Sequence, residues 1–169
     1  MVGKKLTIRD PGEGTRRKVS FLTKSSLIDT SPNAGLDPIG SGGSLHLYNT
    51  SGGGDATCLL LPAAGWSASG EPPLQKFRYV DKAGALGPCK VARVKPPNTL
   101  KVVCKSTVQP IDYSLDEPSQ GSVAVRFTAG LATFCTEFGD NVKKDQVGRF
   151  VAVGAGSPVE CPQPPDDCP

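Results

Sequence analysis

The chain has 169 residues, with 19 Lys or Arg residues against 16 Asp or Glu residues and a formal net charge of +3. This near balance does not by itself indicate a protein that binds polyanions, so no nucleic-acid partner is expected. The longest apolar run, residues 58–66, is interrupted by Pro62 and falls short of the roughly 20 residues that a membrane span needs. The 20 Gly and 16 Pro residues disfavour long helices and favour short strands joined by tight turns.

Apolar and polar residues alternate along most of the chain, as they do in strands that are buried on one face. The predicted strands cover residues 5–10, 18–25, 44–50, 56–62, 75–82, 89–95, 99–105, 111–115, 122–128, 131–138 and 148–155. Turn-forming residues separate these segments, and no helix is predicted. This pattern indicates an all-β fold, an antiparallel β-sandwich or jelly roll of about 10–11 short strands, in a single domain over residues 1–160.

Two stretches fall outside the strand pattern. Residues 26–43 form the longest irregular region and are expected to carry a functional loop, because connections of that length often do. Residues 161–169, CPQPPDDCP, are expected to form an extended strap, since prolines disfavour both helices and strand ladders. Asp166 and Asp167 are expected to lie in its solvated turn.

Two hairpins are predicted. One turns around Gly52–Gly54, and the other, residues 89–104, folds about Pro96–Pro97. The second is expected to pair Val94 with Thr99, Val91 with Val102 and Cys89 with Cys104. Proline at the third position of a four-residue turn favours a type VI turn with a cis peptide bond before Pro97.

The six cysteines, at positions 58, 89, 104, 135, 161 and 168, have spacings typical of disulfides. The paired cysteines of zinc sites and the C-x-x-C redox motif are absent, and His46 is the single histidine. Six cysteines allow 15 pairings, and free buried cysteines are the alternative. The predicted hairpin favours a disulfide between Cys89 and Cys104. A disulfide between Cys135 and Cys161 would pin the tail to the sheet, and Cys58 would then pair with Cys168. Such bridges indicate maturation in an oxidising compartment.

No secretion signal is visible in MVGKKLTIRD, so we expect a mature or excised domain with an added Met, with a cytosolic full-length protein as the alternative. Four stretches of the chain resemble uncharacterised β-rich modules in secreted proteins of environmental bacteria. They are KLTIRD…RRKVSFLTKS, GSLHLYN, FRYVDK…GPCKVARVKPPNTLKVV and GSVAVRFTAGLATFCTEFG…GRFVAVGAGSPVECP. The resemblance covers most of the chain. It implies an extracellular or surface location, pairing of Cys135 with Cys161, and no enzymatic activity or site residues.

Three residues are candidates for ligand binding. Trp66 lies in a predicted loop, AAGWSASG, where its ring either stacks on a sugar or caps the end of the sandwich. His46 and Tyr48 alternate with Leu45 and Leu47 and are expected on an outward face, where a histidine without a role is the simplest interpretation. No hydrolase elbow, phosphate-binding loop or dinucleotide motif is present, so no catalytic residue is assigned.

Acidic residues give weaker candidates. Glycoside hydrolysis needs two carboxylates, and the available ones are Asp81, Asp112, Asp116, Glu117, Glu137 and Asp140. Solvated turn positions explain these residues better. A structural calcium ion near Asp140, Asn141 and Asp145 is weakly supported, because two neighbouring lysines oppose a cation. No metal ligand and no cofactor are therefore assigned.

Basic residues cluster on the second hairpin, at Lys90, Arg93, Lys95, Lys101 and Lys105. Lysines along strands commonly protect sheet edges from pairing with other chains, and this is the preferred explanation. Binding of an anionic polymer is the alternative.

These observations favour a non-catalytic extracellular or cell-surface module that binds a glycan or surface polymer through loops at one end. The alternative is a structural subunit whose partners are copies of itself, held through the exposed start, KKLTIRD, and the Pro-rich end. A third candidate is a glycan-active enzyme, which an acidic cleft with one carboxyl group of raised pKa would support.

Overall fold

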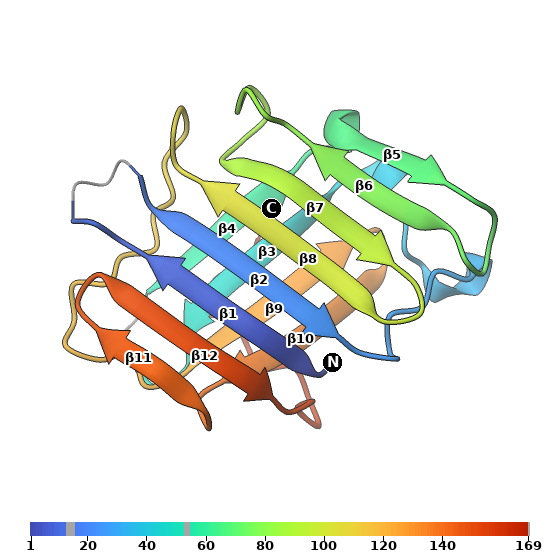
Figure 1. Cartoon of the computed structure of the whole chain (residues 1–169). Helices are drawn as coiled ribbons and strands as arrows, with labels where there is room; N and C mark the ends of the chain where they lie inside the picture. The colour runs from blue at the N-terminus through green and yellow to red at the C-terminus, as the bar shows by residue number, and fades with distance from the viewer. Residues whose placement is uncertain (13–15, 53–54, 169) are drawn as a thin grey trace.

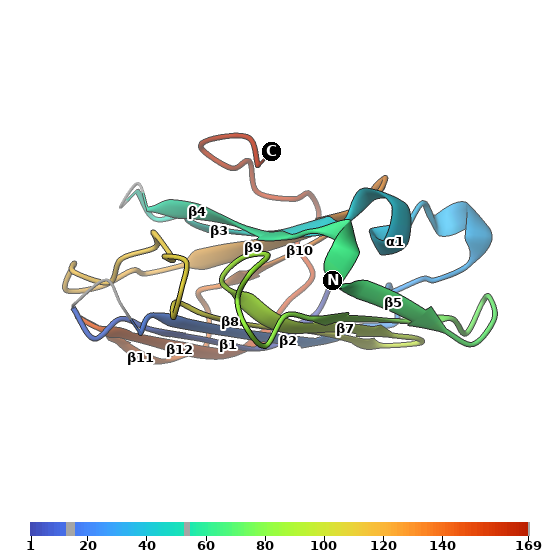
Figure 2. The ribbon, with the colours of Figure 1, turned by 90° about the horizontal axis from the view of Figure 1, so that it is seen from above.

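The computed structural model describes residues 1–12, 16–52 and 55–168. Two antiparallel sheets are stacked face to face (Figures 1 and 2). The larger sheet has the order β11-β12-β1-β2-β8-β7-β6-β5, and the smaller has the order β10-β9-β3-β4. The predicted fold class, an all-β sandwich with disulfides, is confirmed.

The strands are short, as the composition predicts. Those of the eight-stranded sheet are β1 Gly3–Arg9, β2 Lys18–Lys24, β5 Trp66–Ser69, β6 Lys76–Val80, β7 Cys89–Lys95, β8 Thr99–Lys105, β11 Val142–Gln146 and β12 Arg149–Ala155. Those of the four-stranded sheet are β3 Gly43–Asn49, β4 Ala56–Leu61, β9 Val123–Ala129 and β10 Ala132–Phe138. A one-turn helix, α1 Pro38–Ser41, and two 3-10 turns, Pro32–Ala34 and Ala63–Gly65, complete the described elements.

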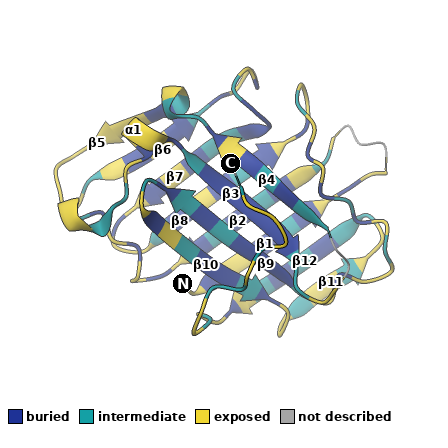
Figure 3. Ribbon diagram, turned by 180° about the vertical axis from the view of Figure 1, so that it is seen from behind, coloured by how far each residue is buried: buried dark blue, intermediate teal, exposed yellow. Residues whose placement is uncertain are grey.

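Alternation along the strands places the apolar residues between the two sheets (Figure 3). Phe21 of the larger sheet and Phe138 of the smaller sheet meet edge to face, with ring centroids 6.2 Å apart. Each is fully buried, and burying one such side chain contributes about 1.5–3 kcal/mol. The outward residues of the alternation lie on the two outer faces, where binding surfaces can form.

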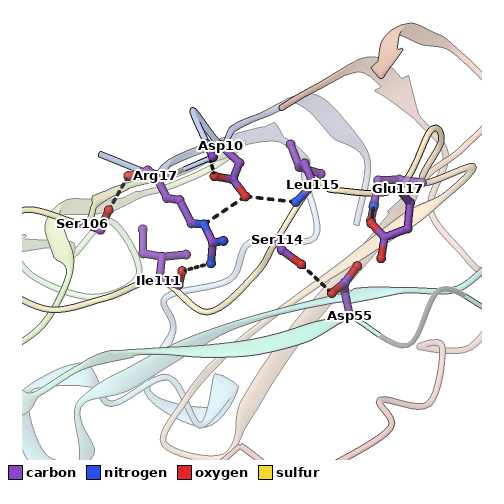
Figure 4. Close-up of polar contacts among 10 residues, drawn as sticks. Asp10, Arg17, Asp55, Ser106, Ile111, Ser114, Leu115 and Glu117 are labelled. Atoms are coloured by element: carbon purple, nitrogen blue, oxygen red, sulfur yellow. Dashed lines mark hydrogen bonds and ion pairs between the residues drawn. The ribbon is translucent and has the colours of Figure 1, made fainter. Parts of the chain in front are cut away.

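Residues 111–115 are a correction, because they form no strand although Ile111, Tyr113 and Leu115 are buried. Side chains satisfy this backbone in place of a neighbouring strand (Figure 4). Nη1 of Arg17 donates to the carbonyl of Ile111 at 2.9 Å, and the amide of Leu115 donates to Oδ2 of Asp10 at 3.1 Å. The alternation of apolar residues therefore predicted correctly which side chains of residues 111–115 are buried, but it predicted wrongly that they pair with a neighbouring strand.

Asp10 and Arg17 form a buried ion pair beneath this segment, with Nε of Arg17 3.0 Å from Oδ2 of Asp10. Burial raises the pKa of Asp10, but hydrogen bonds from the amides of Gly12 and Leu115 and from Arg17 hold that pKa below its ordinary value. The ion pair holds residues 111–115 against the end of β1.

Three further elements were not predicted. β5 and β11 are the two edge strands of the larger sheet, and both lack a clear apolar alternation. Because an edge strand is paired on one side only, its sequence is less constrained. The helix α1 begins at the N-cap Asp37, whose Oδ1 accepts the amide of Gly40 at 2.8 Å, so the prediction of no helix is wrong for this one turn.

The β7–β8 hairpin pairs Cys89 with Cys104, but the register at its tip differs from the prediction by one residue. Val94 pairs with Leu100, and a bulge between Cys89 and Val91 restores the cysteine pair. The peptide bond before Pro97 is cis, as predicted. The other hairpin, β3–β4, is antiparallel; Gly53 and Gly54 of its predicted turn lie outside the described residues.

The chain start is another correction. β1 is paired with β12 on one side and β2 on the other, so KKLTIRD is not an exposed segment that a neighbouring molecule could hold. Met1 is buried, and its amino group donates to the carbonyl of Cys135 at 2.7 Å.

Three disulfides join Cys58 with Cys168, Cys89 with Cys104 and Cys135 with Cys161. These are the three pairs named from the sequence, and they indicate an extracellular or otherwise oxidising environment. Residues 161–168, hereafter the strap, contain no strand and lie outside the smaller sheet (Figure 2). Among the described residues, no helix is long and apolar enough to cross a membrane.

Candidate functional site

One row of directly opposed residues crosses the outer face of the smaller sheet. Cys58 pairs with His46, His46 pairs with Arg126, and Arg126 pairs with Cys135. The strap is bonded at its two ends to the two cysteines that terminate this row. It therefore passes back over the sheet between them (Figures 2 and 3).

His46 and Tyr48 contact the strap directly. The hydroxyl of Tyr48 donates to the carbonyl of Pro162 at 2.5 Å, and Nε2 of His46 lies 3.0 Å from Oδ1 of Asp166. The side chain of His46 is only 2% exposed. The sequence placed His46 and Tyr48 correctly on the outward face, but the expectation of a surface histidine is wrong because the strap covers it.

The environment of His46 favours the neutral imidazole. Burial lowers the pKa of His46 below its ordinary value, and the positive charge of Arg126 acts in the same direction. Asp166 opposes both by stabilising the imidazolium form. Asp166 itself is largely exposed, as expected of a solvated turn, yet it is the partner that the strap brings to His46.

A groove of about 550 Å³ lies beside the strap on the same outer face. A second cross-strand row lines it, formed by Leu60, Ser44, Thr128 and Thr133. The strap contributes further lining residues, and the irregular region 26–43 contributes Ser41 and Gly42. Hydroxyl groups therefore dominate this row, with Leu60 as its apolar end.

Arg126 is the charged residue that β9 contributes to the groove. It is half-buried, and within the described part of the chain no acceptor takes a hydrogen bond from its guanidinium group. A guanidinium carries five N–H donors in a fixed planar arrangement that suits carboxylates and other oxygen acceptors. The groove thus offers unused donors beside three hydroxyl groups.

Trp66 occupies a different place from the one expected. It begins β5 rather than lying in a loop, and only 8% of it is exposed. Its Nε1 donates to the carbonyl of Leu61 at 2.9 Å, and its ring packs against Tyr79 and Phe127. Of the two roles considered for Trp66, stacking on a sugar and capping the end of the sandwich, its burial excludes the first in this structure and agrees with the second.

Asp55, Asp116 and Glu117 bring three carboxyl groups within 4.8 Å of one another, close to the segment in Figure 4. The backbone amide of Glu117 lowers the pKa of its carboxyl group, but burial and the neighbouring Asp55 outweigh it and raise that pKa. The hydroxyl of Ser114 donates to Asp55 at 3.1 Å. None of these carboxyl groups lines the strap-side groove.

Three of the remaining acidic candidates, Asp81, Glu137 and Asp145, accept hydrogen bonds within the fold. Asp145 accepts hydrogen bonds from Ser119 and from the amides of Gln120 and Gly121, which leaves it poorly placed for the calcium site considered from the sequence. Glu137 and Asp140 line a second groove of about 520 Å³. Glu137 accepts the hydroxyl of Thr50 there at 2.5 Å.

Comparison of the chain with known protein families, with curated proteins and with solved structures found no match. The resemblance to modules of secreted bacterial proteins therefore stays a prediction. Sequence reasoning missed Ser44, Arg126, Thr128 and Thr133 as groove residues. Alternation shows that they point away from the core, but only the order of the four strands brings them together.

Proposed function

We propose that this protein is a non-catalytic extracellular module that binds a glycan or surface polymer through the groove beside the strap. The observation that carries the proposal is Arg126, whose guanidinium group lines the groove without an acceptor on the described part of the protein. A sugar carboxylate or hydroxyl oxygen supplies the acceptor that Arg126 lacks.

The hydroxyl groups of Ser44, Thr128 and Thr133 support the same kind of ligand. Each hydroxyl both donates and accepts hydrogen bonds, as the hydroxyl groups of a sugar also do. The row runs across neighbouring strands, which are spaced about 4.8 Å apart, so its polar groups follow an extended ligand. The residue that would stack on a sugar ring, Trp66, is buried, and recognition in this groove rests on polar contacts and Leu60.

The environment of His46 supports a binding role over a hydrolytic one. A histidine base in a hydrolase contacts its hydroxyl nucleophile at hydrogen-bond distance. Among the described residues no hydroxyl group makes that bond to His46, whose Nε2 faces Asp166 instead. His46 and Tyr48 are positioning residues in this proposal, since they hold the strap that forms one side of the groove.

A binding screen over immobilised glycans and cell-wall polymers tests the proposal, followed by titration of the strongest ligand with Arg126→Gln. A hydrogen bond to a charged group contributes about 1.5–3 kcal/mol, so this variant is expected to bind about 10- to 100-fold more weakly. Lys82→Gln removes one positive charge from an exposed residue outside the groove and should bind like the wild type. Equal binding by Arg126→Gln would contradict the proposal.

A further inference from the structure

Basic residues form two rows on the outer face of the larger sheet, the face turned to the viewer in Figure 1. In the first row Arg9 pairs with Lys18 and Lys18 pairs with Lys105. In the second row Arg78 pairs with Arg93 and Arg93 pairs with Lys101. All six side chains are exposed, and we call them the basic face.

The basic face places like charges directly opposite one another, an arrangement that destabilises a sheet. No carboxylate compensates within the strands that form it, because β1, β2, β6, β7 and β8 contain no Asp or Glu. The ion pairs among the described residues, Arg17–Asp10 and His46–Asp166, lie elsewhere. Within residues 1–12, 16–52 and 55–168, the fold therefore maintains a repulsive cluster of cations that no ion pair neutralises.

Protection of a sheet edge, which the sequence favoured for the basic hairpin, does not explain this cluster. The edges of the larger sheet are β11 and β5, whereas β1, β2, β8, β7 and β6 all have a neighbour on each side. Charges on the outward faces of interior strands block no free backbone edge. That explanation is therefore wrong for Arg93, Lys101 and Lys105.

The surface is also hollowed between the two rows. A shallow groove of about 320 Å³ is lined by Lys5, Arg9, Lys18 and Lys101, with Thr7, Ser20 and Leu22 between them. Cations surround this groove and hydroxyl groups lie within it, so it suits a chain that carries both negative charges and polar groups.

We propose that the basic face binds a linear anionic polysaccharide. The cations step across neighbouring strands at about 4.8 Å, which matches an extended polymer with repeated charges rather than a single small anion. Every aromatic residue in the strands of the larger sheet is buried, whereas proteins that bind single-stranded nucleic acid use exposed rings on which bases stack. The three disulfides indicate an oxidising environment, where extracellular polysaccharides are the polyanions at hand.

This site is independent of the groove assigned above. The basic face and the strap lie on opposite sides of the sandwich (Figure 2), and Arg126 belongs to the other sheet. The net charge of +3 conceals the basic face because the acidic residues are concentrated in loops outside these strands. One module would thus contact a glycan on one side and an anionic chain on the other.

The test compares dextran sulfate with uncharged dextran, in titrations at low and at physiological salt. The wild type is expected to bind dextran sulfate with an affinity that falls steeply as the salt concentration rises. It is expected not to bind uncharged dextran. Lys18→Gln/Lys101→Gln is expected to bind at least about tenfold more weakly at low salt, with no loss of melting temperature because like-charge repulsion is relieved. Lys82→Gln/Lys143→Gln removes the same net charge elsewhere and should bind within about twofold of the wild type.

Three results would overturn the proposal. One is absence of binding to dextran sulfate by the wild type, and another is equal weakening by both double variants. The third is a duplex DNA bound as tightly as dextran sulfate with the same dependence on Lys18 and Lys101, which would assign the face to nucleic acid. Arg126→Gln should leave dextran sulfate binding unchanged, so failure of the groove proposal is distinguishable from failure of this one.

Discussion

His46 lies beneath Asp166 of the strap, with Nε2 of the imidazole 3.0 Å from Oδ1 of the carboxylate. The two residues are 120 positions apart, and disulfides hold the strap at its two ends. Burial disfavours the charge on His46 and Asp166 favours it. The contact therefore couples the protonation of His46 to the position of the strap, and both can be measured.

Asp166→Asn should lower the pKa of His46 further below its ordinary value. The substitution removes the charge that stabilises the imidazolium form, while burial under the strap remains. An NMR titration of the single histidine reports this pKa directly. Asp140→Asn is the control, because Asp140 is exposed and lines a groove that includes neither His46 nor Asp166. A pKa that stays the same or rises in Asp166→Asn would exclude the His46–Asp166 contact in solution.

Acidification should destabilise the fold through His46. Its pKa is lowered in the folded state, so as the pH falls from about 6.5 the unfolded chain takes up the proton first. Stability is then lost until the pH passes the folded pKa. Glu117 changes the stability in the opposite direction. Its pKa is raised in the folded state, so the stability that it contributes at low pH is lost as the pH rises. Urea unfolding of the wild type and of His46→Gln from pH 7.5 to 5 isolates His46, and parallel curves would refute its role.

Releasing the strap should be costly. The Cys58–Cys168 disulfide closes a loop with a sequence separation of 110 residues, for which loop entropy gives about 4–5 kcal/mol. Cys58→Ala/Cys168→Ala is expected to lose about that free energy of unfolding in urea. Its His46 should also titrate closer to the ordinary pKa, because water reaches the imidazole. An unchanged His46 titration would mean that the strap stays in place without this bond.

Asp10→Ala should destabilise the sandwich by about 3 kcal/mol, because it leaves the buried Nε of Arg17 and the amide of Leu115 without this acceptor. Asp37→Ala is the matched control. Asp37 also accepts a backbone amide, but it is exposed at the N-cap of α1, where the loss is about 1 kcal/mol. Thermal or urea unfolding measures both, and equal losses would show that the Asp10–Arg17 pair does not hold segment 111–115.

The core of this fold could be predicted from the sequence because its signal is local. Alternation in β1 and β2 places residues such as Leu6 and Phe21 inside without knowledge of any neighbour. Segment 111–115 carries the same alternation, yet Asp10 and Arg17 satisfy its backbone. Whether an alternating segment finds a partner strand depends on tertiary contacts that its own residues do not encode.

The candidate surfaces were harder to predict because each one depends on the strand order. Thr128 and Thr133 meet through the β9–β10 pair, but Ser44 reaches them only because β3 lies beside β9. Likewise the charges of Lys18 and Lys105 are distant in sequence and opposed only through the β2–β8 pair. His46 was assigned to the correct face, while its burial depends on where the strap is bonded.

The central claim is that the groove beside the strap binds the ligand, and an NMR titration with the glycan or polymer selected by the screen tests it most directly. Our account predicts that amide signals of the groove rows, Ser44, Arg126, Thr128 and Thr133, shift with the ligand, and that Arg126→Gln weakens these shifts. Signals of β1, β2 and β8 should stay in place for an uncharged ligand. Shifts confined to residues outside the groove, with Arg126→Gln titrating like the wild type, would contradict the account.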